Sequence, residues 1–250
     1  MSLVGAAMDR RHILEFLEKF GFTTGVKIER VDNALRKNIE DRVKKVVGSR
    51  PPLLVIHFQG HGVLIRDTVQ YITSDQNEGG TLEGLTAEEL IEMFSNLTIW
   101  TMSLVSDHRF LSFGQFVSSA VSTGYKAGWV LLLVKIVSPM LHVAGSLRWQ
   151  QVYETEMRGG YLTNSLAQLK AKPMTLPHFL LELRQGVYGH LEATKAKLNP
   201  LAQAMCQDAQ IFSSDMWPLD DPQILLKIRL GTARPVPSTS TWFTMGRFLH

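Results

Sequence analysis

The chain has 250 residues, of which 45% are hydrophobic, and this is enough to bury a sizeable core within one domain. The formal net charge is +3, and the basic residues are scattered rather than arranged in a stripe with aromatics, which argues against nucleic-acid binding. The single cysteine, Cys206, excludes an internal disulfide framework and a cysteine-rich zinc site, and it suits a reducing compartment. The start, MSLVGAAMDRRH, soon becomes polar, so we expect no signal peptide and a cytoplasmic protein.

Apolar residues recur at helical spacing in several segments, and local signals mark where helices start and stop. The stripe of the first predicted helix consists of Ile13, Leu14, Leu17 and Phe20. Gly21 follows that stripe as a stop signal. Thr86 and Glu89 form a T-x-x-E capping box that opens another helix. The predicted helices cover residues 8–20, 34–47, 86–94, 161–170 and 176–191.

Short apolar or alternating runs between these segments predict strands. Residues 53–58 form a continuous apolar run bounded by prolines and a glycine, which predicts a strand buried on both faces. Residues 127–147 are apolar as well, but a lysine, a proline and a histidine interrupt them below the roughly 20 residues of a membrane span. We therefore expect buried strands there and no membrane contact. The predicted strands cover residues 27–31, 53–58, 69–73, 97–104, 130–137 and 141–146.

Strands that alternate with helices predict a doubly wound α/β fold, with a mainly parallel sheet and helices on both faces. In such sheets, functional groups gather at the carboxyl ends of the strands. Gly60-His61-Gly62 follows the strand predicted over 53–58. A neutral imidazole at such an end can act as a general base, and the flanking glycines would let the backbone turn sharply. We expect the Pro-, Ser- and Thr-rich residues 216–250 to form a loosely ordered tail.

The run that ends in Gln59-Gly60-His61-Gly62 resembles the S-G-H-G strand end of the caspase-like cysteine peptidases, especially the fungal and plant metacaspases. Further segments resemble the family in order and spacing, over residues 3–104 and 140–214 in total. These segments are LVGAAMDRRHILEFLEKFGF, VDNALRKNIEDRVKKV, YITSDQNEGG, GLTAEELIEMF, MLHVAGSLRWQQVYETEMRGGYLTNSLAQL, LPHFLLELRQGVY and NPLAQAMCQDAQIF.

The resemblance implies a caspase-like domain over residues 1–215, in which residues 105–139 are an atypical insertion or a misread junction. Family members carry a hydrophobic strand just before the segment that matches Leu3. The resemblance therefore predicts that the first core strand is missing from this chain. Because a missing strand leaves backbone groups without partners, we expect the chain as written to be marginally stable or to need rearrangement.

In that family the histidine, here His61, activates a cysteine at the end of the next core strand, in a D-x-C-x-S-G type motif. The thiolate attacks the scissile carbonyl, and the imidazolium then protonates the leaving amine. The matching segment here, LTIWTMSLVSDHRF, contains no cysteine. Ser103 and Ser106 lie near the expected position, but a hydroxyl is a much weaker acid than a thiol. Cys206 lies in a segment far from this motif, and we expect it to be a small buried hydrophobic side chain.

Metacaspases prefer Arg or Lys before the cleaved bond, and acidic side chains hold that cation. Asp9 matches one such acid, although a first-turn helix acid favoured by the helix dipole is an equally good interpretation. Gln59 replaces the serine that stands two residues before the histidine. Asp75 lies in the stretch that resembles the family's substrate loop. The residues indicate no metal site and no cofactor, and only the resemblance brings calcium into consideration.

Three functions remain open at this point. The first is an inactive pseudopeptidase, or truncated relative, of the caspase-like endopeptidases that keeps His61 without its nucleophile. The second is a residual peptidase that uses Ser103, Ser106 or Cys206 with His61. The third is a non-catalytic α/β protein-interaction module in which the Gly-His-Gly motif is a coincidence. We expect a protein or peptide partner, not a nucleic acid or a membrane, and the sequence does not indicate an oligomeric state.

Overall fold

The protein is described by a computed structural model. The structure describes residues 5–23, 27–32, 35–49, 51, 53–65, 68–76, 82–86, 89, 93, 100–108, 140–146, 150, 152–155, 157–197, 205–213 and 217–234. The helices are α1 (Ala6–Lys19), α2 (Arg36–Ser49), α6 (Tyr161–Gln168), α7 (Leu176–Lys195) and α8 (Ile224–Arg229). The strands are β1 (Leu53–Ile65), β2 (Thr68–Gln76), β3 (Leu82–Thr86), β4 (Trp100–His108), β5 (Met140–Ala144), β6 (Glu154–Thr155), β7 (Gly159–Gly160) and β8 (Gln210–Ser213).

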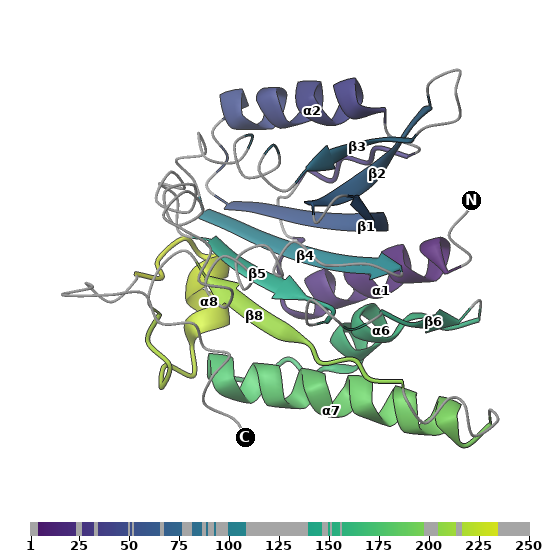
Figure 1. The fold of residues 1–250 in the computed structure, drawn as a ribbon. Coiled ribbons are helices and arrows are strands. Elements are labelled where there is room, and N and C mark those ends of the chain that lie inside the picture. Colours follow the sequence, from purple (N-terminus) through teal and green to yellow (C-terminus); the bar gives the residue numbers. More distant parts are fainter. Residues whose placement is uncertain are drawn as a thin grey trace, which may run out of the picture.

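The described strands form one six-stranded sheet in the order β3-β2-β1-β4-β5-β8 (Figure 1), together with the small pair β6-β7. The centre of the large sheet is parallel, because β4 pairs in parallel with both β1 and β5. The outer pairs β1-β2, β2-β3 and β5-β8 are antiparallel. The expected mainly parallel sheet is therefore confirmed only at its centre. Two-residue and other short connections cannot carry a parallel crossover, so β1, β2 and β3 must pair antiparallel.

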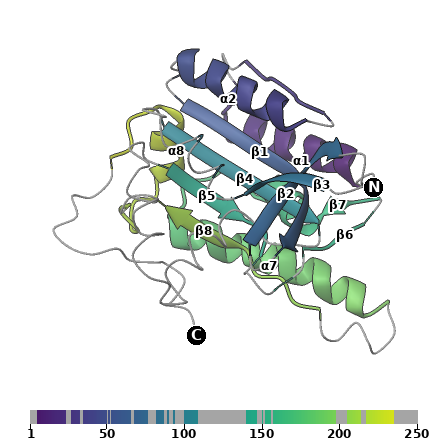
Figure 2. The same cartoon turned by 45° about the horizontal axis from the view of Figure 1, so that its top comes forward.

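Helices α1, α6 and α7 gather on one side of the molecule, where α6 contacts both of the others. Helix α2 lies on the opposite side of the molecule from α7, next to β2 and β3 (Figures 1 and 2). The main core joins α1, α6, α7 and α8 to β5 and β8. Its fully buried side chains include Phe16, Val143, Leu162, Leu166, Leu176, Phe179, Leu183, Ala209 and Ile224. None of the helices that the structure describes is long and apolar enough to cross a membrane.

Helix α1 confirms the first predicted helix, but one residue of the predicted buried stripe is exposed. Ile13 and Phe16 are buried, whereas Leu14 is 42% exposed, so its place in the predicted stripe was wrong. The ring of Phe16 packs against Phe20 and Phe179, with centroids 4.9 and 6.4 Å away. These partners select the face that includes Phe16, since a helix buries the side that meets its neighbours.

Two other elements differ from the sequence-based expectation. Residues 27–31 are not a strand; instead Glu29 pairs with Lys27 and Arg42. Residues 217–234, expected to lie in a loosely ordered tail, contain α8 and contribute to the core. Trp217 and Ile228 are 3% and 2% exposed. The spacing of the apolar residues in α8 outweighs the surrounding Pro-rich composition, because it lets one side of a short helix be buried.

Strand β1 is longer than predicted and does not end at Gly60. It continues through Gly60-His61-Gly62 to Ile65, and residues 53–59 are half-buried rather than buried on both faces. Its pairing with β4 runs from Leu53 to His61, and its pairing with β2 runs from Gly62 to Ile65. His61 therefore lies where β1 passes from one partner strand to the other. The expected gap beside residues 53–58, where the first core strand would lie, stays a prediction.

Candidate functional site

Gly60 is required by packing, not by a sharp turn. A Cβ atom at this position would lie 2.5 to 2.6 Å from ring and hydroxyl atoms of Tyr71 in β2. The Tyr71 hydroxyl donates a hydrogen bond of 2.7 Å to the backbone carbonyl of Gln59. Its ring also meets the ring of Phe58 edge to face, at 5.9 Å between centroids. The glycine before His61 thus lets a tyrosine from β2 lie against β1 and hold it.

Asp9 and Gln59, two of the predicted substrate-binding residues, contact each other directly. The Gln59 Nε2 donates to Asp9 Oδ2 over 2.6 Å. The other carboxylate oxygen, Oδ1, accepts from the backbone N–H of Gly160 over 2.6 Å and from Thr163 Oγ1 over 2.5 Å. One carboxylate from α1 therefore joins β1 to the start of α6. Asp9 also lies in the first turn of α1, as the alternative interpretation of this residue expected.

Burial dominates the electrostatics of Asp9, whose residue is only 3% exposed. Desolvation raises the pKa of Asp9 above its usual value, although the hydrogen bonds from Thr163, Gly160 and Gln59 act to lower it. The backbone of Gly159, at φ +66°, passes close enough that a Cβ there would lie 2.4 Å from Asp9 Oδ1. Both oxygens are occupied by donors of the chain itself, so a substrate cation would have to displace Gln59 to reach Oδ2.

The backbone places the remaining predicted site residues at different points of the sheet. In the parallel register of β1 and β4, His61 pairs with His108, Gln59 with Ser106 and Ile56 with Ser103. Ser106 is two positions before the partner of His61, and Ser103 is five. At 3.3 Å per residue these offsets correspond to about 7 and 16 Å along the strand.

Because strand residues alternate between faces, Ser106 shares the sheet face of His61, and Ser103 lies on the other face. Asp75 lies near the end of β2, beyond the residues that pair with β1. Cys206 precedes β8 and is exposed, so the expectation that it would be buried was wrong. It stands outside the core, while its neighbour Met205 packs against the small cluster around Tyr161.

Sequence reasoning missed two histidines, His12 and His190, of which His12 lies near Asp9. The buried Nδ1 of His12 and the buried Nε2 of His190 have no hydrogen-bond partner among the described residues. Desolvation lowers the pKa of both histidines, and Asp9 acts against this at His12. The ring of Tyr161 packs on His190 at 5.5 Å between centroids. The only sequence signal was the spacing of His12 three residues after Asp9, which brings both to one side of α1.

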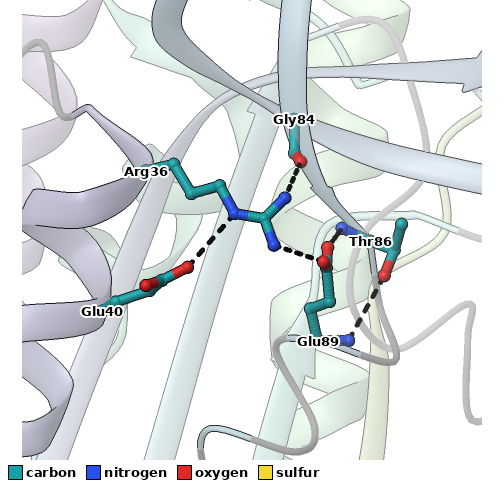
Figure 3. A network of polar contacts seen from close by, with 5 residues as sticks. All are labelled: Arg36, Glu40, Gly84, Thr86 and Glu89. Carbon is teal, nitrogen blue, oxygen red and sulfur yellow. Dashed lines mark hydrogen bonds and ion pairs between the residues drawn. The ribbon is translucent and has the colours of Figure 1, made fainter.

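A polar network joins α2 to the end of β3 (Figure 3). The predicted capping box is confirmed, because the N–H of Thr86 donates to Glu89 Oε2 over 2.8 Å and the N–H of Glu89 donates to Thr86 Oγ1 over 3.3 Å. Most of the helix predicted after it lies outside the described residues. Arg36 also donates to Glu89, to Glu40 and to the carbonyl of Gly84. Only the Arg36–Glu40 spacing of four was visible in the sequence.

The described side chains do not fit a calcium ion. Calcium takes six to eight oxygen ligands, largely from carboxylates. Among the described side chains, no three residues of His, Cys, Asp or Glu come together in a group that could hold a metal ion.

The first part of the chain matches a known protein family. Residues 1–103 match the model of the caspase domain, peptidase family C14. Over this part of the chain, which is less than half of its length, the sequence is similar to the caspase domain. The match ends inside β4, five residues before the strand does. No curated protein matches the sequence.

Two solved structures are similar to the chain. Caspase-1 from Spodoptera frugiperda has 13% sequence identity and a TM-score of 0.54, over 85% of this chain and 79% of that one. The likeness shows the caspase-like fold. Protein GSU0716 from Geobacter sulfurreducens has 10% identity and a TM-score of 0.47, over 72% of this chain and 73% of that one.

Proposed function

We propose that this caspase-domain protein is a pseudopeptidase, which keeps the histidine of the family's site but does not cleave peptide bonds. The observation that carries the proposal is the register of β1 and β4. The residue directly opposite His61 is His108, which offers no thiol or hydroxyl. A nucleophile has to lie within hydrogen-bond reach of its base for the base to take its proton.

The remaining nucleophile candidates are poorly suited to this role. Ser106 shares the sheet face of His61 but lies two register positions away, and its hydroxyl is a far weaker acid than a thiol. Ser103 lies on the other face of the sheet. Cys206 precedes β8, which is separated from β1 by β4 and β5. Ser106 is therefore the residue to test if any activity is found.

The arrangement around Asp9 also favours a binding role over cleavage. Gln59 occupies one oxygen of the acid that the family resemblance assigns to the substrate cation, and α6 occupies the other. We propose that the protein acts in the cytoplasm by binding a protein or peptide partner.

The test uses the full chain and two activity-based probes, a fluorophosphonate and a thiol-reactive peptide. Fluorogenic peptides with Arg, Lys or Asp before the cleaved bond are assayed beside them. We expect no turnover, and labelling that is equal in the wild type and in His61→Ala. Labelling or turnover that is lost in His61→Ala would overturn the proposal. Loss in Ser106→Ala as well would then assign the nucleophile, and Ser103→Ala is the matched control on the other sheet face.

A further inference from the structure

Among the described residues, no strand lies beside the first part of β1 on the side away from β4. Strand β1 pairs with β4 from Leu53 to His61, whereas β2 pairs with β1 only from Gly62 to Ile65. An open strand edge presents backbone N–H and C=O groups that can pair with another chain. We infer that this edge of β1, at Leu53 and Val55, binds an extended apolar segment of a partner protein, which adds to the sheet as a further strand.

The contact of Tyr71 shows which backbone groups point to the open edge. Its hydroxyl comes from β2 and reaches the carbonyl of Gln59, so that carbonyl points away from β4. Successive residues of a strand direct their backbone groups to opposite edges, and the register of β1 and β4 is continuous from Leu53 to His61. Leu53 and Val55 stand an even number of residues before Gln59, so their N–H and C=O groups point to the same open edge.

The side chains beside this edge are apolar and only half-buried. Leu53 and Val55 of β1, together with Leu17 and Phe20 of α1, pack against the border of the main core. A strand in the parallel centre of an α/β sheet is normally buried on both faces, so half-burial marks core surface that a further strand could cover. Every second side chain of the added strand would lie over these four residues. The partner segment should therefore carry aliphatic residues at alternate positions.

The edge has none of the features that normally prevent pairing. Natural edge strands are protected by charged side chains, prolines or bulges. Residues 53–59 contain no aspartate, glutamate, lysine, arginine or proline, and their register with β4 has no shift. The sheet of a second copy would meet β2 and β3, which follow on the same side of β1. A single extended segment can instead run beside β1 as far as the point where β2 begins, which favours a peptide over a dimer.

This peptide site rests on the proposed binding of a protein or peptide partner, and it does not depend on the lack of peptidase activity. The probe is the fluorescent heptapeptide Lys-Val-Thr-Val-Thr-Val-Lys, and fluorescence anisotropy measures its binding to the full chain. We expect saturable binding. No binding up to about 1 mM peptide would overturn the site and leave the pseudopeptidase intact. Cleavage of the bound probe would overturn the pseudopeptidase and leave the site intact.

A substitution beside the edge tests the apolar part of the site. Leu17→Lys should weaken binding about tenfold or more, because a charged side chain would then lie beside the added strand. The control is Leu181→Lys, at an exposed leucine of α7, and it should leave the affinity within about twofold. Equal affinities of the two variants would contradict the position of the site.

Two N-methylated forms of the probe test the backbone pairing. In a strand, the N–H groups of the valines face one neighbour and those of the threonines face the other. Methylation of one set should weaken binding about tenfold or more, and methylation of the other set should change it little. Equal effects of the two sets would contradict pairing at a sheet edge.

Amide hydrogen exchange of the wild-type chain needs no variant. The N–H of Val55 should exchange about tenfold more slowly with saturating peptide, whereas that of Ile56, which points towards β4, should change little. Slow exchange at Val55 already in the free chain would overturn the site, because the chain itself would then cover the edge.

Discussion

The two parts of the chain on either side of residues 109–139 are held by different kinds of contact. In residues 5–108, polar contacts join the elements: Asp9 with Gln59, Tyr71 with the carbonyl of Gln59, and Arg36 with Glu89. In residues 140–234, α6, α7, β5, β8 and α8 share one apolar core, which α1 joins from the first part through Ile13 and Phe16. The family match covers residues 1–103 and thus includes only the part of this core that Ile13, Phe16 and Phe22 contribute. Substitutions should therefore separate the geometry around His61 from the stability of the domain.

The largest effect is expected in the apolar part. Phe179 is fully buried in α7 and packs against Phe16 of α1. Phe179→Ala should lower the free energy of unfolding by about 3 to 5 kcal/mol, because it removes a large apolar side chain and leaves a cavity. Urea denaturation measures this change. Tyr188→Ala, on the exposed side of the same helix, is the control and should change stability by no more than about 0.5 kcal/mol. Equal effects of the two substitutions would contradict the assignment of the core.

The next largest effect is expected at the polar junction of Asp9. Asp9→Ala should cost about 2 to 4 kcal/mol, because the N–H of Gly160 and the side-chain amide of Gln59 lose their acceptor inside the protein. Asp9→Asn keeps one carbonyl oxygen for these donors and should cost less. Amide hydrogen exchange at residues 59–62 should rise in Asp9→Ala, since Gln59 is then no longer held to α1. Unchanged exchange there would show that the junction does not hold this part of β1.

The pH dependence of stability should follow the buried histidines. Burial lowers the pKa of His142 to about 3 and also lowers the pKa values of His12 and His190. Their folded pKa values lie below the unfolded value near 6.5, so the fold favours the neutral form. Their contribution to stability is complete above pH 6.5 and is lost as the pH falls below it, and for His142 this loss continues to about pH 3. Asp9 acts in the opposite direction, because its folded pKa is raised.

Thermal unfolding between pH 7.5 and 4 measures this effect. Each histidine that stays neutral in the fold withdraws up to about 1.4 kcal/mol of stability per pH unit below 6.5. We expect the melting temperature to fall through this range. His142→Leu should flatten the dependence, because the histidine with the lowest pKa no longer contributes. A profile with the wild-type slope in this variant would contradict the assignment.

The smallest effect is expected in the half-exposed network of Figure 3. A double-mutant cycle of Arg36→Ala and Glu89→Ala should give a coupling of about 0.5 to 1 kcal/mol, since solvent screens such pairs. Arg36→Lys should not restore the full coupling, because an ammonium group lacks the planar fork that reaches Glu89, Glu40 and Gly84 together. A coupling near zero would mean that the network adds nothing to the link between α2 and β3.

Elements with a local signal were predicted well. Helices α1, α6 and α7 follow from apolar spacing within their own segments, and the Thr86–Glu89 capping box follows from residues three apart. Strands were predicted less well. Residues 27–31 alternate but form no strand, and β1 continues past Gly60. The limits of a strand depend on the partner that it pairs with, and that partner is distant in the sequence.

The sequence by itself determined that a histidine stands between glycines after an apolar run, that the chain has one cysteine, and that these residues resemble a caspase domain without its thiol. Only the tertiary structure decided that His108 is the residue opposite His61, that Gln59 contacts Asp9, and that Gly60 makes room for Tyr71. The physical reason is register. One residue of shift between β1 and β4 would bring a different β4 residue opposite His61, and the partners that set the register lie far away along the chain.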